Sequence, residues 1–235
     1  MTMLSLVTIP LLLLSASATA FNVLGYANVQ YTILYYHYRD LSFQSYPCMG
    51  YPLQADWNIS LPILHTFTDG FFSGIFWNIL EVNATQDLLK MATDLTLPLA
   101  PNANATNTHD IGFVIMSSFG HGYRLLKKPE YLEIIVKGAN SLSTRYSPIV
   151  RCTRSWDSPD GFLVIIDNMM NLELLFEASN RTNNQTFYNI AWQHANRTMY
   201  EHFRPDNSTY HVVEYNETDG SVVRKYTAQG IYQKH

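Results

Sequence analysis

Apolar side chains recur every three or four residues along most of the chain after Phe71, which is the spacing of one face of an α-helix. The clearest stripe is Tyr131, Ile134, Ile135, Gly138, Leu142 and Tyr146. A second stripe is Phe187, Ile190, Ala191, Ala195 and Met199, with Asn189, Gln193 and Asn196 on the opposite face. The same spacing predicts further helices at Phe72–Val82, Gln86–Leu95, Ile111–Leu125 and Asp167–Ala178, and one before Tyr38.

The chain is therefore predicted to be mainly α-helical, with loops where Pro, Asn and Gly gather, at 98–107, 155–161 and 180–185. Only the last part changes period. Ser208–Tyr215 alternates like a strand, Asn216–Gly220 has the composition of a turn, and Ser221–Tyr226 follows as a partner strand. This pattern predicts a short β-hairpin near the C-terminus.

The first residues have the pattern of a secretory signal peptide. An apolar run from Leu4 to Leu14 is followed by small residues up to Ala20, which predicts cleavage after Ala20. The run is shorter than the roughly 20 residues that a membrane-spanning helix needs. We therefore expect residues 1–20 to be the signal peptide and residues 21–235 to form one domain. The mature protein is expected to be secreted, with no membrane partner after cleavage.

Eight Asn-x-Ser/Thr sequons agree with export, because N-glycans are added in the eukaryotic secretory pathway. The candidate glycosylation sites are Asn58, Asn83, Asn104, Asn180, Asn184, Asn196, Asn207 and Asn216.

Composition narrows the partners. A net charge of −4 without a basic run argues against nucleic acid, and 47% hydrophobic residues are enough for a real core. The only cysteines, Cys48 and Cys152, form neither a disulfide framework nor a zinc module. An oxidising compartment would favour their pairing, but the sequence leaves open whether their Cα atoms approach to about 6 Å.

Two aspartates, Asp110 and Asp167, stand where helical patterns begin. One interpretation is helix capping, since Asp is a favoured residue at helix N-termini. The other is acid/base chemistry. Asp167 lies between apolar segments, 162–166 and 169–170, which would strip water from its carboxylate and favour the protonated acid. A carboxylic acid that stays protonated near neutral pH can donate a proton and then act as a base, provided that the second carboxylate lies nearby.

Aromatic residues offer candidate platforms for sugars. Trp77 and Trp192 lie within helical patterns and are interpreted as core residues. Phe67 and Trp156 lie in loops, beside Asp69 and Asp157, and are better placed to reach a cleft.

Other chemistries lack their motifs. No His-x-x-x-His spacing, which would place two metal ligands on one helix face, occurs among His109, His121, His194, His202 and His211. We therefore expect no metal and no cofactor. The segment Gly70–Gly74 has one residue too many for the Gly-x-Ser-x-Gly nucleophile elbow, so acyl transfer has no support.

Several strings, taken together and in order, resemble the unsaturated glucuronyl hydrolases, glycoside hydrolase family 88. They are Thr68–Trp77, His109–Phe113, Ser141–Arg145, Ile165–Asn171, His202–Asp206, Ser208–His211 and Thr227–Gly230. The resemblance implies a barrel of six helical hairpins, (α/α)6, with the active cleft among the loops at one end. It also implies a substrate, an oligosaccharide that ends in an unsaturated uronic acid.

The resemblance implies residue roles as well. Asp167 would protonate C4 of the C4=C5 double bond and then activate the water that attacks C5, with Asp110 as its partner. His109, His211 and Gln229 match positions that contact the sugar or the water. Phe67 stands where the family has a stacking Trp, so the stacking face is kept and the indole N–H is lost.

Members of that family continue beyond the match to Thr227–Gly230 with a segment that holds the substrate carboxylate, and with the remaining hairpins. We therefore expect this chain to form an incomplete (α/α)6 barrel with apolar helix faces along an open edge. Two hypotheses follow. One is a secreted unsaturated-uronic-acid hydrolase, and the other is a secreted glycoprotein that keeps the scaffold without turnover and at most binds carbohydrate.

Overall fold

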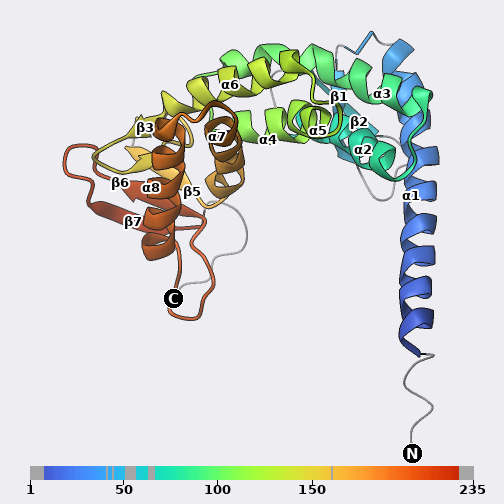
Figure 1. Ribbon diagram of the computed structural model, residues 1–235. Coiled ribbons are helices and arrows are strands. Elements are labelled where there is room, and N and C mark those ends of the chain that lie inside the picture. Colours follow the sequence, from blue (N-terminus) through green and yellow to red (C-terminus); the bar gives the residue numbers. More distant parts are fainter. Residues whose placement is uncertain are drawn as a thin grey trace, which may run out of the picture.

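The computed structural model describes residues 8–40, 42–43, 45–50, 57–62, 67–159 and 161–227. Helices dominate, and they follow one another along an open arc with α1 at one end and a small sheet at the other (Figure 1). The helices are α1 (Thr8–Asp40), α2 (Asp69–Val82), α3 (Gln86–Thr96), α4 (Ile111–Ile115), α5 (His121–Leu126), α6 (Pro129–Ser143), α7 (Asn168–Thr182) and α8 (Gln185–Glu201).

The strands form three small antiparallel groups. A hairpin joins β1 (Ser45–Gly50) to β2 (Trp57–Pro62), and a second pairs β3 (Tyr146–Ser147) with β4 (Cys152–Thr153). The third is a sheet in the order β5 (Phe162–Ile165), β6 (Val212–Tyr215), β7 (Val222–Tyr226). The predicted C-terminal hairpin is thus confirmed as β6 and β7.

Helical periodicity located the helices well. Each helix predicted after Phe71 is found, and the stripe on α6 is buried at Tyr131, Ile135, Gly138 and Leu142. The single helix expected at Ile111–Leu125 is an uninterrupted helical run in which a π-helical segment, Met116–Gly120, separates α4 from α5. The mainly α-helical prediction is therefore correct.

Several details differ from the prediction. The segment expected to be a loop at 98–107 begins as a 3-10 helix, Leu97–Asn104, and the loop expected at 180–185 is reduced to residues 183–184 because α7 and α8 extend further. The apolar run Phe162–Ile165 is a third strand, β5, which pairs with β6. A short, continuously apolar run is typical both of a strand buried on both faces and of a buried helical segment, so periodicity alone does not distinguish them.

The face that α8 buries was also misjudged. Trp192 is 53% exposed, although it was interpreted as a core residue, and Met199 is exposed as well. The buried face carries His194 and Thr198 instead, after Phe187, Ile190 and Ala191. Apolar periodicity does not identify polar residues that lie on the buried face of a helix. Trp77, by contrast, is fully buried and donates its indole N–H to Thr96 Oγ1 at 2.9 Å.

Glycines set how closely the helices approach. A Cβ on Gly70 would lie 2.5 Å from the carbonyl oxygen of Val114, and one on Gly74 would lie 2.8 Å from that of Ser117. The string Gly70–Gly74 is therefore a packing surface through which α2 contacts the α4 region. Gly112 plays the same part between α4 and α7, since its Cβ would lie 2.5 Å from the Cα of Asn171.

Helix α1 belongs to the domain at its C-terminal end. Tyr35 and Tyr38 are buried, and their rings pack on Phe76 and Phe72, respectively. The predicted cleavage position after Ala20 precedes these contacts, so the signal peptide remains a prediction that the packing accommodates. Among the described residues no helix is long and apolar enough to span a membrane.

Cys152 is a free thiol in β4, and burial raises its pKa to about 12. A thiol in such surroundings stays protonated and is a poor nucleophile. The side chain of Cys48 lies outside the described residues.

The close approach at Gly112 makes a prediction. Replacing Gly112 with Ala should lower the free energy of unfolding by about 1–3 kcal/mol, because overpacking against backbone forces the helices apart. Gly25→Ala is the matched control, since a Cβ there meets nothing within 4 Å, and we expect it to be neutral or stabilising by up to about 1 kcal/mol. Urea unfolding followed by circular dichroism measures both, and equal effects of the two substitutions would contradict the packing argument.

Candidate active site

Asp110 and Asp167 each occupy the N-cap position of a helix, before α4 and α7, respectively. Neither side chain accepts a capping hydrogen bond from its helix. The carboxylate of Asp110 instead accepts a hydrogen bond from the Thr108 hydroxyl at 2.9 Å. The capping interpretation therefore fails for both residues, and their carboxylates are available for other contacts.

The contact between α4 and α7 brings these two helix starts together. Besides the close approach of Gly112 to Asn171, the backbone N–H of Phe113 donates to Asn171 Oδ1 at 2.8 Å. Both contacts lie in the first turn of each helix. The residues that precede the helices, Asp110 and Asp167, therefore meet at the same end of the packed pair.

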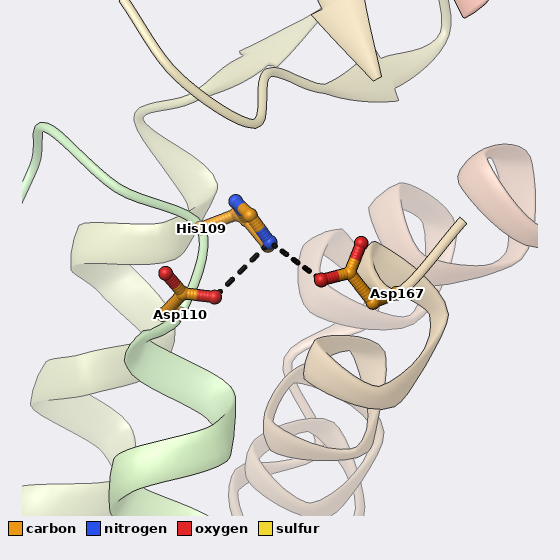
Figure 2. A group of neighbouring side chains, drawn as sticks. All are labelled: His109, Asp110 and Asp167. Atoms are coloured by element: carbon orange, nitrogen blue, oxygen red, sulfur yellow. Dashed lines mark ion pairs between the residues drawn. The ribbon is translucent and has the colours of Figure 1, made fainter. Parts of the chain in front are cut away.

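His109 lies between the two carboxylates (Figure 2). Its Nε2 is 3.1 Å from Asp110 Oδ1 and 3.7 Å from Asp167 Oδ2. The ring is 1% exposed, and Nε2 has no aligned hydrogen bond among the described residues despite the short distance to Asp110. Oδ1 of Asp167 is likewise buried without a partner there. Buried polar atoms without a hydrogen bond are uncommon in folded proteins, and here two of them lie in one cluster.

The opposite ring nitrogen fixes the tautomer of His109. Nδ1 lies 3.0 Å from the carbonyl oxygen of Ser155, which also accepts the backbone N–H of His109 at 3.2 Å. Because a carbonyl oxygen can only accept, Nδ1 carries a proton. In the neutral ring Nε2 is then a lone-pair acceptor that faces two carboxylates.

Two carboxylates and one imidazole nitrogen therefore converge in a small volume. These are the residue types that general acid and base catalysis uses.

The surroundings of Asp167 differ from the prediction. Its side chain is 41% exposed, against 21% for Asp110. The apolar residues of β5 point into the sheet's own clusters, and Met169 and Met170 are turned to solvent. These apolar neighbours therefore do not enclose the Asp167 side chain, and the group beside its carboxylate is the His109 imidazole.

Trp156 belongs to the site. Its ring lies 6.0 Å from that of His109 in an edge-on arrangement, and its backbone pairs with Thr108 in an isolated β-bridge. The side chain is 38% exposed, so part of the indole remains available for a ligand. The loop position predicted for Trp156 thus brings it beside the two carboxylates.

Phe67 lies at the same end of α4, 50% exposed. Its ring centroid is 6.0 Å from that of Phe113 and 6.3 Å from that of Phe71. Since Phe113 lies in the first turn of α4, this aromatic group borders the site on the side of α4.

His211 is brought to the site by the sheet. Its carbonyl oxygen accepts the backbone N–H of Ile166 at 2.9 Å, which sets His211 beside the residue that precedes Asp167. The side chain is half-buried. Gln229 lies outside the described residues.

His109, Asp110 and Asp167 could also hold a cation. One ligand atom from each lies within 4.8 Å of the others. The absence of a His-x-x-x-His spacing does not address such a set, because two of its three ligands are carboxylates. A chelator therefore belongs among the controls of any activity measurement.

A buried polar network supports the site, and the sequence did not reveal it. The Asn168 side chain accepts from the Ser155 hydroxyl at 2.7 Å and donates to the Thr153 carbonyl at 2.9 Å. Thr153 in turn donates its backbone N–H to His194 Nδ1 at 3.0 Å. Asn168 adjoins Asp167 in the sequence, and Ser155 holds His109, so the network connects both. In the sequence, the members of this network are recognisable only as polar residues that stand within or beside apolar segments.

Comparison with known proteins agrees with this geometry. An unsaturated glucuronyl hydrolase of Formosa agariphila is 42% identical over 171 residues, which are 70% of this chain and 42% of that protein. A solved unsaturated glucuronyl hydrolase specific for heparin is 36% identical, with a TM-score of 0.75 over 80% of this chain and 50% of its own. The chain is homologous to the unsaturated glucuronyl hydrolases.

Other relatives widen the group. The unsaturated chondroitin disaccharide hydrolase of Streptococcus agalactiae is 27% identical over 77% of this chain and 47% of its own length. The glucuronyl hydrolase structure from Bacillus sp. GL1 gives a TM-score of 0.76 at 22% identity, covering 85% of this chain and 54% of its own, and supports the (α/α)6 fold. No family model matches. The chain spans about half the length of these relatives.

Two buried histidines, His194 and His202, predict that the stability of the fold decreases at acidic pH. Burial lowers the pKa of His194 to about 3 and that of His202 to about 4. An unfolded histidine titrates near 6.5, so below that pH the unfolded chain binds protons that the folded chain excludes. Their contribution to stability is complete above about pH 6.5 and is lost toward pH 4, by up to about 1.4 kcal/mol per pH unit for each histidine.

Urea unfolding between pH 7 and pH 4 measures this slope. His194→Asn should flatten it by about one proton, whereas His37→Asn on the exposed side of α1 should not. A slope that is the same in His194→Asn and the unmodified chain would show that His194 is not the group responsible.

Proposed function

We propose that this chain carries the acid/base centre of a glycoside hydrolase that hydrates the C4=C5 double bond of terminal unsaturated uronic acids in lyase-generated oligosaccharides. The observation that carries the proposal is the convergence of Asp110 and Asp167 on the Nε2 atom of His109. Homology to unsaturated glucuronyl hydrolases supplies the substrate class.

In the proposed reaction Asp167, protonated at the start, gives its proton to C4. The double-bond electrons form the new C4–H bond, and C5 becomes electron-poor, with the charge shared by the ring oxygen. Asp167, now a carboxylate, takes a proton from water as the water oxygen bonds to C5. The product is a hemiketal at C5, which opens and rearranges so that the glycosidic bond to the next sugar breaks.

Neighbouring residues have distinct parts in this proposal. The negative charge of Asp110 favours the positive charge that develops near C5, and the Nε2 atom of His109 accepts a hydrogen bond from the protonated carboxyl group. Trp156 and Phe67 supply apolar faces for the sugar ring. His211 and Gln229 are proposed as polar contacts to the sugar or to the water. No step in this scheme requires a cofactor.

The names of the relatives indicate possible parent polysaccharides. One curated relative is a chondroitin disaccharide hydrolase, and one solved relative is specific for heparin. Disaccharides from both sources are therefore suitable test substrates.

A second candidate is a scaffold that binds carbohydrate without turnover. Large apolar side chains that are exposed to solvent favour this candidate. They lie on α8 and directly after it, at Trp192, Met199, Tyr200 and Phe203. The match covers 50% of the solved heparin-specific relative, so that protein has further structure that could cover such a face.

We also propose that the protein is a secreted glycoprotein. Six of the sequon asparagines are exposed, Asn196 is half-buried, and the side chain of Asn58 lies outside the described residues. The Oδ1 atoms of Asn184 and Asn216 accept backbone N–H groups, at 3.0 and 2.8 Å. A glycan attaches through Nδ2, so both hydrogen bonds are compatible with glycosylation.

The activity test follows the ultraviolet absorbance of the conjugated double bond while the purified chain acts on chondroitin- and heparin-derived unsaturated disaccharides. Absorbance should fall with the unmodified chain, and Asp167→Asn should reduce the rate at least about 100-fold, because the amide can neither donate to C4 nor deprotonate water. Asp110→Asn should also reduce it, by a smaller factor.

Asp87→Asn, an exposed substitution in the first turn of α3, is the matched control and should retain full activity. Persistence of the rate in a chelator would exclude a required cation at the three-residue cluster. A folded chain that binds the disaccharides without any fall in absorbance would support the scaffold candidate instead.

Secretion and glycosylation are tested by expression in a eukaryotic cell with N-terminal sequencing of the secreted product. We expect the sequence to begin at Phe21 and the mass to fall on treatment with an N-glycosidase. Replacement of Asn83, Asn104 and Asn207 by Gln should remove part of that shift. Retention of the chain inside the cell, with an intact leader, would contradict the proposal.

A further inference from the structure

The guanidinium group of Arg145 is buried between the two loops that carry His109 and Trp156. Its Nε donates to the carbonyl oxygen of Arg154 at 2.8 Å, and its Nη1 donates to the carbonyl oxygen of Thr106. Its Nη2 reaches the carbonyl oxygen of Ser155 at 3.3 Å and Asp157 Oδ1 at 3.1 Å. One side chain therefore ties 106–110 to 154–157.

A planar guanidinium suits this task because its five N–H groups point outward in a fixed fork. Here they reach acceptors from both loops at once. The backbone adds to the connection, since the N–H of Arg154 donates to the carbonyl of Arg145 at 2.9 Å. A lysine ammonium is a single point donor and could not span the same set of carbonyls.

The Ser155 carbonyl links this clamp to the carboxylate pair. It accepts from Arg145, from the backbone of His109 and from His109 Nδ1. If this peptide group rotated, Nδ1 would lose its acceptor. The ring could then place its proton on Nε2, and the group facing Asp110 and Asp167 would change from an acceptor to a donor.

We propose that Arg145 is a positioning residue, which acts through the Ser155 carbonyl to hold His109 in its Nδ1–H tautomer with Nε2 directed at Asp110 and Asp167. The hydrogen bonds of Arg145 go to loop carbonyls and to Asp157. Its effect on turnover rests on the proposed function, but its effect on the tautomer does not.

The test is long-range ¹H–¹⁵N NMR of the full chain labelled at histidine, at a pH high enough for the ring to be neutral. His109→Gln assigns the signals of His109. In the unmodified chain Nδ1 should be the protonated nitrogen. Arg145→Met should add signals of the Nε2–H tautomer, and Arg145→Lys should give an intermediate ratio of the two.

Arg124→Met is the matched control, because Arg124 makes an exposed bidentate pair with Glu81 and should leave the His109 signals unchanged. Folded Arg145→Met and Arg145→Lys proteins with the same His109 signals as the unmodified chain would overturn the proposal. So would unfolding of both while Arg124→Met stays folded, because Arg145 would then be a determinant of the fold.

Activity gives a second, separate readout. If the unmodified chain turns over substrate, Arg145→Lys should lower kcat more than it raises KM and should alter the pH profile. A purely structural clamp would lower the amount of folded enzyme and leave the pH profile unchanged. An inactive unmodified chain would count against the proposed function alone, because the NMR measurement does not depend on turnover.

Discussion

The contact between α4 and α7 is the constraint on which the site depends. Two backbones can approach this closely only because Gly112 has no side chain, and Asn171 completes the contact by accepting the N–H of Phe113. The contact lies in the first turn of both helices, so it brings together the residues just before them. Asp110 and Asp167 are distant in sequence, and this packing makes them neighbours.

The surroundings of Asp167 differ from those that the sequence suggested. Apolar residues around Asp167 indicated desolvation, but in the fold these residues fill the sheet's clusters and the Asp167 side chain is 41% exposed. What distinguishes the site is instead the convergence of Asp110 and Asp167 on the Nε2 atom of His109, while the Ser155 carbonyl accepts a hydrogen bond from Nδ1 of the same ring.

The sequence predicted what local periodicity and local motifs encode. Helices from α2 to α8 follow from apolar spacing, and the hairpin of β6 and β7 follows from alternation around a turn. Both aspartates and Trp156 were identified because each stands at a change of pattern. The strand β5, the exposed position of Trp192 and the Asn168 network were missed, since each depends on partners far along the chain. An apolar tetrapeptide does not specify its partner, and a buried Asn is recognisable only when its hydrogen-bond partners are known.

The three residues of the acid/base cluster are all brought together within this chain, whereas some of its apolar helix faces remain exposed. The relative placement of His109, Asp110 and Asp167 follows from the contact between the first turns of α4 and α7 and from the loops that Arg145 joins. The geometry of the cluster is therefore set by elements that the structure describes. The faces that expose Trp192 and Tyr200 obtain no cover from the described residues. The acid/base cluster and the burial of these apolar faces thus have separate requirements. A measurement of the protonated nitrogen of His109 tests the first without the second.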